Sequence, residues 1–487
     1  AITVHISYTS CHRKVTSEML GGQKLLNAGP MQRGGRAEAP VRTHRTSAGK
    51  MVVRATLADV EEAKLDGRAV RRSLNQTGRY TRQPNNNQDS QMLMEDHGVG
   101  YSAMGLVAQM RENNNTWQQG EISITLAKAY GYCWGVERAV RMAYETRKSF
   151  PDRKLFITNE IIHNPQVNQR LVELDINIVE EVQGKGKDYE PIASGDVVIF
   201  PAFGATAQEM KYFKDKGVQM VDTTCPWVAK VWNSVDTYSK KLFTSVIHGK
   251  YSHEETVATA SFAGDYIIVK DLQEGQYVCD YILNGGDEKE FMEMFKNAVS
   301  AGFAPGPMLQ RVGLANQTTM LKGDTQQLGK MLEKTMMKKY GPDKLNEHFM
   351  VMDTICDATQ ERQDALYEIT NDPSAIDMMI VVGGFNSSNT SHLQEIAEHK
   401  GIPSFWVDSE RRIDVATNTI LHKLSYGELK ETTNWLPKGP LRIGVTSGAS
   451  TPDRAVEEVL DLVFRIKDPS FAGITPKECA PMVVPTH

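Results

Sequence analysis

Three cysteines, Cys133, Cys225 and Cys356, stand in closely similar local sequences and are the side chains best suited to holding a metal centre. Each precedes a segment typical of a helix start, and two share the lead-in Asp-Thr-x-Cys. They are too far apart in the chain for a local finger, so only a fold that brings similar units together can use all three. Iron–sulfur clusters are usually held by four thiolates. Three converging thiolates therefore predict a cluster with one iron open to a substrate.

Other uses of these thiols fit the pattern less well. A free cysteine is often a small buried hydrophobe, and we expect that structural role for Cys11, Cys279 and Cys479. Six cysteines in 487 residues are too few for a disulfide-dense scaffold. Zinc stays open on ligand type alone, although the chain has no CxxC pair of the kind common in structural zinc sites.

The composition separates the N-terminus from the rest. Residues 1–50 hold eight Lys and Arg against two acids, whereas the whole chain has a formal net charge of −5. A basic, acid-poor segment without an apolar core is typical of an organellar transit peptide, which we expect over 1–55, with a basic tail as the alternative. The segment lacks the alternation of aromatic and basic residues that would indicate nucleic-acid binding. No apolar run in the sequence is long enough to predict a membrane span. Residues 56–120 are predicted as an N-terminal extension or linker with one amphipathic piece around 104–110.

Five stretches repeat one plan, in which an apolar strand leads through a polar loop to a helix. The clearest copies start at VVIF (197–200) and MIVV (379–382), and Gly217 or Gly401 follows their helices. Looser copies start at LFIT (155–158), FTSVIHG (243–249) and RIGVT (442–446). Strands alternating with helices predict parallel α/β units, and a glycine after a helix is a common stop signal. In open α/β sheets the ligand binds beyond the carboxyl ends of the strands.

The loops at those strand ends carry groups that bind anions. Ser and Asn at a helix N-terminus form an anion cradle, because free N–H groups and the helix dipole both favour negative charge. The same residues also cap helices without binding anything. Their occurrence in equivalent loops, with histidines in the others, favours a phosphate-sized ligand. The candidates are His163, His253, Ser387, Ser388, Asn389 and Ser450.

Glu255 is the best candidate for acid–base chemistry. A carboxylate kept in a buried site can have a raised pKa and deliver a proton, although a solvated helix start would also explain it. No GxxxxGK[ST] loop is present and no GxGxxG follows a strand, so ATP and nicotinamide cofactors are not supported.

Eight motifs resemble, in sequence and order, those of the 4-hydroxy-3-methylbut-2-enyl diphosphate reductase family: GYCWGVERA, IIHN, DTTCPWVAKV, SHEETV, NQTTM, ICDATQERQ, NSSN and GVTSGASTP. The resemblance runs from about Ser123 to Phe464. Trp134 and PAFG (201–204) resemble the plant and cyanobacterial type, whereas the bacterial type carries a histidine where Phe203 stands. The resemblance implies a trefoil of three small parallel α/β domains around a central [4Fe–4S] cluster. We expect these domains at 121–224, 225–352 and 353–440, with 441–487 returning to the body.

The resemblance also implies residue roles. Cys133, Cys225 and Cys356 match the three cluster ligands, which leave one iron open. Glu255 matches the proton-delivering glutamate and Thr318 the threonine near the substrate hydroxyl, with Gln317 and Thr319 shaping that loop, and His253 is counted with the catalytic residues. The remaining matches bind diphosphate: His163, His253, Ser387, Ser388, Asn389 and Ser450.

The implied reaction is reductive dehydroxylation of 4-hydroxy-3-methylbut-2-enyl diphosphate to isopentenyl and dimethylallyl diphosphate, the last step of the methylerythritol phosphate route to isoprenoids. Ferredoxin is the implied electron donor, and the plastid stroma the implied location. Two alternatives stay open: an iron–sulfur hydro-lyase, which needs no reductant, and a cluster-based redox sensor, which needs no acid at Glu255.

Overall fold

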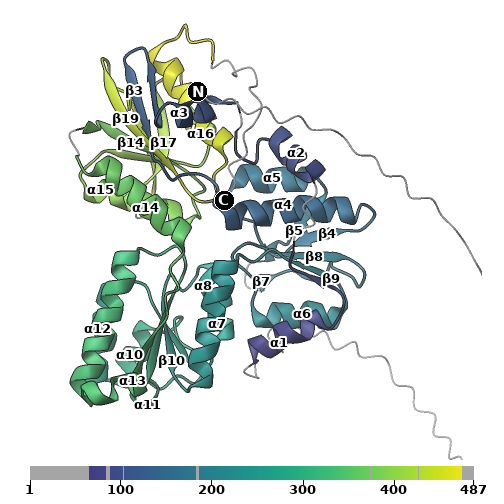
Figure 1. Ribbon diagram of the computed structural model, residues 1–487, viewed down its shortest axis with the longest axis vertical. Coiled ribbons are helices and arrows are strands. Elements are labelled where there is room, and N and C mark those ends of the chain that lie inside the picture. The colour runs from purple at the N-terminus through teal and green to yellow at the C-terminus, as the bar shows by residue number, and fades with distance from the viewer. Residues whose placement is uncertain are drawn as a thin grey trace, which may run out of the picture. The chain divides into compact units, whose positions relative to one another are not determined.

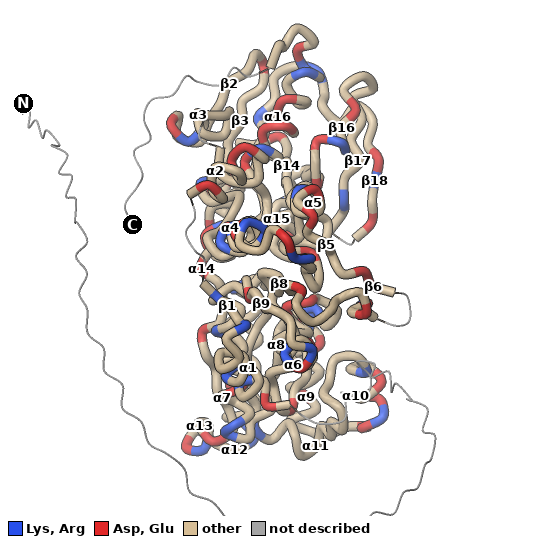
Figure 2. Tube along the Cα trace, turned by 90° about the vertical axis from the view of Figure 1, so that its right-hand side faces the viewer, with Lys and Arg blue, Asp and Glu red and all other residues tan. Residues whose placement is uncertain are grey.

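The computed structural model describes residues 65–83, 88–102, 104–182, 186–372, 375–425 and 427–473. In these ranges, two parallel β-sheets and one mixed sheet with a parallel centre are flanked by helices (Figure 1). The predicted α/β fold is therefore confirmed. The expected transit peptide at 1–55, Cys11 and Cys479 lie outside the described residues. Lys and Arg are interspersed with Asp and Glu along the helices (Figure 2). None of the helices described has both the length and the apolar character of a membrane span.

The first sheet is parallel throughout, in the order β1-β9-β8-β4-β5. Strand β8 is buried along its whole length, as expected of a parallel strand covered on both faces. Helix α6 starts with a capping box between Thr206 and Glu209 and ends at Gly217, whose φ of 79° gives the predicted stop. The elements are β1 (Tyr80–Thr81), α4 (Trp134–Ser149), β4 (Leu155–Ile157), α5 (Pro165–Glu173), β5 (Ile176–Ile178), β8 (Val197–Phe200), α6 (Ala207–Lys216) and β9 (Gln219–Asp222), with a small hairpin of β6 (Glu181–Val182) and β7 (Gly186–Lys187).

The second sheet is also parallel, in the order β11-β10-β12-β13. Its core includes Cys279, which is 2% exposed and packs as the structural residue expected. Its strands are β10 (Thr244–His248), β11 (Tyr266–Val269), β12 (Val312–Asn316) and β13 (Phe349–Val351). Its helices are α7 (Pro226–Lys240), α8 (Glu254–Phe262), α9 (Leu272–Asn284), α10 (Glu288–Met294), α11 (Pro305–Met308), α12 (Lys322–Tyr340), η2 (Pro342–Lys344) and α13 (Leu345–His348).

The third sheet has the order β16-β17-β15-β14-β19-β3-β2, with β18 paired to β17. Strands β15, β14, β19 and β3 are parallel, and antiparallel strands extend both edges. The strands are β2 (Thr116–Gln119), β3 (Ile122–Leu126), β14 (Met378–Val382), β15 (Ser404–Val407), β16 (Ile413–Asp414), β17 (Thr419–Lys423), β18 (Leu429–Thr433) and β19 (Leu441–Ser447). The helices are α14 (Asp357–Thr370), α15 (Ser388–His399), η4 (Glu410–Arg412) and α16 (Asp453–Lys467).

The strand pairing differs from the sequence-based division at two places. Strand β3 falls in the segment expected to form the first unit, 121–224, but it pairs with β19 in the third sheet. Strand β19 belongs to the segment 441–487 that was expected to return to the body, and it lies inside the third sheet beside β14, so that sheet extends beyond the expected limit of the third unit at 440. The reason is that the apolar pattern of a strand predicts burial without specifying which sheet buries it.

The extension at 56–120 is more ordered than a linker wherever the structure describes it. Helix α1 (Gly67–Asn75) buries Val70 and Leu74 in the first core, and α2 (Gln88–Asp96) buries Met94. The amphipathic piece expected around 104–110 is α3 (Leu106–Glu112), which packs on the third sheet. These elements are short and bury only one to three apolar side chains each, so their period is too weak to recognise in an Asn- and Gln-rich segment.

Candidate functional site

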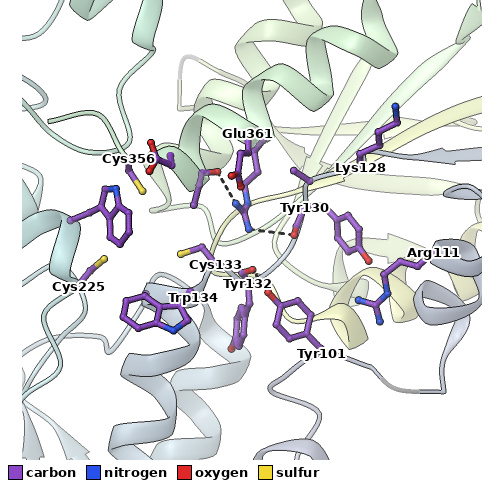
Figure 3. A pocket seen from close by; sticks show the side chains of 16 residues that line it. Tyr101, Arg111, Lys128, Tyr130, Tyr132, Cys133, Trp134, Cys225, Cys356 and Glu361 are labelled. Atoms are coloured by element: carbon purple, nitrogen blue, oxygen red, sulfur yellow. Dashed lines mark hydrogen bonds between the residues drawn. The ribbon is translucent and has the colours of Figure 1, made fainter. Parts of the chain in front are cut away.

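Each of the three cysteines occupies the N-cap position of a helix. Cys133 precedes α4, Cys225 precedes α7 and Cys356 precedes α14, and none of the three caps is closed by a side-chain hydrogen bond. Figure 3 shows the three sulfur atoms pointing toward one another. Helix N-termini present unpaired N–H groups and the positive end of the helix dipole, so this point favours negatively charged sulfur or a negatively charged centre.

The thiols of Cys225 and Cys356 keep their protons at neutral pH when no cation holds them, because the pKa of each is raised. Burial and the neighbouring Cys133 thiol raise the pKa of Cys225 to about 12. Burial also raises the pKa of Cys356. A metal centre releases such protons on binding, because the thiolate is the ligand.

The backbone beside the sulfurs is shaped to leave them room. A Cβ atom on Gly135 would lie 2.5 Å from the Cys225 sulfur, so only glycine fits there. Cys279 lies in the core of the second sheet, and no fourth thiol occurs among the described residues around the three sulfurs. This donor set fits a cluster with three protein thiolates and does not fit a four-thiolate zinc site.

Two buried arginines tie the cysteine loops together, and sequence reasoning missed both. Arg138, on the helix that Cys133 caps, donates to the carbonyl of Thr223 at 3.2 Å, just before Cys225. Arg362, on the helix that Cys356 caps, donates to the carbonyl of Gly131 at 2.5 Å, just before Cys133. Each arginine therefore joins one cysteine helix to the lead-in of another. Arg362 belongs to the ERQ of the motif ICDATQERQ, so its position in the sequence was visible. It was not selected because a charged residue on a helix usually indicates a solvated face.

Glu255, in the first turn of α8, and Thr318, just after β12, form a buried pair. The Thr318 main-chain N–H donates to Glu255 Oε1 at 2.6 Å, and its hydroxyl donates to Oε2 at 2.9 Å. Burial raises the pKa of Glu255 to about 7, although the two Thr318 hydrogen bonds lower it. The carboxyl group can therefore hold a proton near neutral pH and release it to a reacting group.

The rings of His163 and His253 lie edge to face, with their centroids 5.4 Å apart. His163 Nδ1 lies 3.1 Å from Glu160, and its Nε2 is buried without a hydrogen-bond partner among the described residues. The Glu255 main-chain N–H donates to His253 Nδ1, so His253 keeps its proton on Nε2. Burial lowers the pKa of His253 to about 3. His163 Nε2 faces a Glu254 carboxylate oxygen at 3.6 Å, which is too long for a hydrogen bond, so each ring keeps a nitrogen that a ligand can use.

Phe203 stacks on the His163 ring, with centroids 4.7 Å apart and an interplanar angle of 13°. The residue that stands where the bacterial type has a histidine thus orients an imidazole instead of adding one. Stacked aromatic pairs of this kind contribute about 0.5–1.5 kcal/mol beyond burial.

The start of α15, after β14, contributes polar groups that lack partners, and the loop after β19 adds Ser450. Ser388 Oγ and Asn389 Nδ2 are buried and make no hydrogen bond within the part of the chain that the structure describes. Ser387 caps α15, and Ser450 Oγ donates to the His163 carbonyl at 3.1 Å. Unsatisfied buried donors are costly and rare. Their clustering here indicates a ligand that accepts hydrogen bonds.

All eleven residues selected from the sequence line one cavity of about 110 Å³. Phe203 and Thr319 line it as well, together with apolar residues such as Val136 and Val228. Gln317 lies behind it, where its amide oxygen accepts from the Lys250 N–H at 3.1 Å and its amide nitrogen donates to Thr319 at 2.7 Å. The residues are Cys133, Cys225, Cys356, His163, His253, Glu255, Thr318, Ser387, Ser388, Asn389 and Ser450.

Two other cavities share walls with this one. A cavity of about 590 Å³ reaches the same cysteines and is lined by Tyr101 from the extension and by Trp134, which is 56% exposed (Figure 3). A cavity of about 300 Å³ shares His253, Ser387 and Ser388. The thiols and the anion-binding groups thus open onto different spaces.

The fold and the cavity define a parallel α/β protein whose buried centre combines three thiols, one acid and an anion cradle. The family model described as LytB protein matches residues 124–464. The chain belongs to this LytB family. A chloroplastic 4-hydroxy-3-methylbut-2-enyl diphosphate reductase of Botryococcus braunii is 61% identical over 425 residues, covering 86% of this chain and 85% of that protein.

A less similar relative carries the same name, and a solved structure shares the fold. The reductase of the same name from Crocosphaera subtropica is 55% identical over 404 residues, covering 83% of this chain and 99% of that protein. The solved structure of the E-1-hydroxy-2-methyl-but-2-enyl-4-diphosphate reductase from Plasmodium falciparum shares the fold, with a TM-score of 0.51 at 21% identity over 73% of this chain and 94% of that one.

Proposed function

We propose that this protein reduces 4-hydroxy-3-methylbut-2-enyl diphosphate to isopentenyl and dimethylallyl diphosphate. The substrate takes up two electrons and two protons, its C–O bond breaks, and the hydroxyl leaves as water. One observation carries the proposal: a single cavity is lined by three thiols, a carboxyl group with a pKa near 7 and buried donors without partners. The family membership and the names of the relatives support the same activity.

Cys133, Cys225 and Cys356 would hold a [4Fe–4S] cluster with one iron free of protein ligands. When bound, that group would supply the electrons and a Lewis-acidic iron for the substrate hydroxyl. The three helix N-termini around it favour added negative charge. The fit of the three-thiol donor set and the space beside Gly135 support this assignment.

The remaining side chains would bind the substrate and move a proton. His163, His253, Ser387, Ser388, Asn389 and Ser450 would hold the diphosphate. His163 Nε2, Ser388 Oγ and Asn389 Nδ2 are buried without partners and match its acceptor oxygens, and the other three side chains line the same cavity. Glu255 would deliver the proton to the leaving hydroxyl, with Thr318 beside that hydroxyl and holding the carboxyl in place. Apolar side chains such as Val136 and Val228 would keep bulk water from the reacting carbons.

The proposal also covers the domain arrangement, the electron donor and the cellular location of the enzyme. The three sheets would form a trefoil of α/β units around the cluster, because strand ends from all three contribute to the cavity. Ferredoxin would be the electron donor, since the chain carries no nucleotide-binding motif of its own. The acid-poor basic leader and the chloroplastic relative support a plastid location, in the stroma.

An anaerobic assay tests the activity directly. Protein with a full complement of iron is mixed with 4-hydroxy-3-methylbut-2-enyl diphosphate and reduced methyl viologen, and the bleaching of the dye is followed. We expect bleaching that requires both protein and substrate, with two dye equivalents used per substrate. Loss of the substrate hydroxyl without reductant would instead support the hydro-lyase alternative. Cluster-loaded protein that does neither would support the redox sensor.

A further inference from the structure

The cavity of about 300 Å³ beside the diphosphate groups carries two lysines from different sheets. Lys250 lies in the loop after β10, two residues past the end of that strand. Lys423 is the last residue of β17, in the antiparallel extension of the third sheet. The cavity shares His253, Ser387 and Ser388 with the buried site, so the lysines lie on the anion-binding side of that site.

Lys423 is held in place and still has free donors. Its ammonium group lies 5.0 Å from the centroid of the Trp406 ring and donates to the Phe385 carbonyl at 2.6 Å. An ammonium group has three N–H donors, so two are left for a ligand. Burial and the charge of Lys250 lower the pKa of Lys423, which means that the two like charges are close enough to repel each other.

Lys250 is tied to the histidine of the buried site through its backbone. The His253 N–H donates to the Lys250 carbonyl at 3.0 Å, and Gln317 accepts from the Lys250 N–H. Its side chain is exposed, and within the described ranges no carboxylate lies within 4.0 Å of the ammonium group of Lys250 or Lys423. Glu395, whose pKa the charge of Lys250 lowers slightly, is already bound by His392 at 2.7 Å and by Ser391 at 3.1 Å.

Two neighbouring ammonium groups without a carboxylate partner are unfavourable unless an anion joins them. We propose that Lys250 and Lys423 form a capture site for the diphosphate group of the substrate at the entrance of the buried cavity. An incoming diphosphate would first bridge the two lysines and then move inward to His253, Ser387 and Ser388. This inference rests on the proposed function and adds to it the side from which the substrate enters.

The role predicts a specific kinetic signature. The capture site lies outside the cavity that holds the reacting carbons, so it acts on association and not on the chemical step. Electrostatic capture raises association rates by tenfold or more and weakens with ionic strength. The test uses the full-length, cluster-loaded protein and compares wild type with the double variant Lys250→Gln/Lys423→Met. Methionine keeps the aliphatic packing of Lys423 on Trp406 and Phe385.

We expect the double variant to raise KM about tenfold, keep kcat within about twofold, and show a shallower fall of kcat/KM with salt. Lys338→Gln, which removes an exposed charge on α12, is the matched control and should behave as wild type. Lys250→Arg/Lys423→Arg should restore KM. A double variant with the KM and salt dependence of the control would overturn the proposal. So would a loss confined to kcat.

Binding of inorganic diphosphate, measured by calorimetry on the same proteins, separates this inference from the proposed function. We expect the double variant to bind it several-fold more weakly than wild type and Lys338→Gln do. If wild type turned nothing over, the proposed function would fail, but the calorimetric comparison would still decide whether the lysines bind diphosphate. If the double variant lost iron or melted early, Lys250→Gln alone decides, because the side chain of Lys250 is exposed.

Discussion

The Thr318 main chain and hydroxyl together bind both carboxylate oxygens of Glu255, at 2.6 and 2.9 Å. Burial and these hydrogen bonds act in opposite directions on the pKa of Glu255, and burial dominates. The result, a pKa of about 7, places the carboxyl group where it can both hold and release a proton at neutral pH. Thr318 thus limits how far burial raises the pKa.

The pH dependence of turnover should show this balance. An acid with a pKa of about 7 is protonated below that pH and loses its proton above it, so kcat should fall as the pH rises through about 7. Thr318→Val removes the hydroxyl donor but keeps the main-chain N–H. Because that donor lowers the pKa, its loss should move the falling limb to higher pH. A limb that stays in place would show that another group titrates.

Replacing the acid should separate electron supply from proton delivery. We expect Glu255→Gln to keep its iron and its visible absorbance but to lose turnover by at least about a hundredfold, the usual contribution of a positioned general acid. Glu288→Gln is the matched control, since Glu288 is an exposed glutamate in the first turn of another helix, α10, and does not line the cavity. Full activity of Glu255→Gln would remove Glu255 from the proton path.

The iron content should depend on Cys225, which lines the cavity, and not on Cys279, which lies in the core of the second sheet. Cys225→Ser should lose most of its iron and its visible absorbance, because a hydroxyl is a poor substitute for a thiolate ligand. Cys279→Ser changes the same residue type in the core of the second sheet, where it should cost about 1–2 kcal/mol of unfolding free energy but no iron. Iron analysis and chemical denaturation measure the two effects. Equal iron contents in the two variants would contradict the ligand assignment.

Gly135 gives an independent test of the space around the sulfurs. Gly135→Ala would place a methyl group 2.5 Å from the Cys225 sulfur, so we expect cluster content and activity to fall together. Gly323→Ala, in the first turn of α12, meets no atom within 4 Å and should leave iron unchanged while raising stability by up to about 1 kcal/mol. Normal iron in Gly135→Ala would mean that the sulfurs lie elsewhere when the cluster is bound.

Much of this arrangement could be predicted because the repeated units are local. The strand, loop and helix around 197–222 lie within a short segment, and β8, α6 and β9 form as expected. The site followed from the same rule, because residues at the carboxyl ends of parallel strands meet at one edge. Pairing between distant segments could not be predicted this way. The contact of β3 with β19, and the arginines at 138 and 362, depend on which surfaces meet and leave no periodic signal.

The pairing of β3 with β19 also sets an order of events during synthesis. The loop that carries Cys133 starts at the end of β3, and the Cys133 N–H donates to the Ala449 carbonyl, just after β19. A ribosome has made nearly the whole body before β19 emerges, so the nascent chain holds Cys133 without its final neighbours until then. We therefore expect the proposed cluster to be assembled on the released polypeptide. A truncation before Leu441 should yield chains that hold no iron.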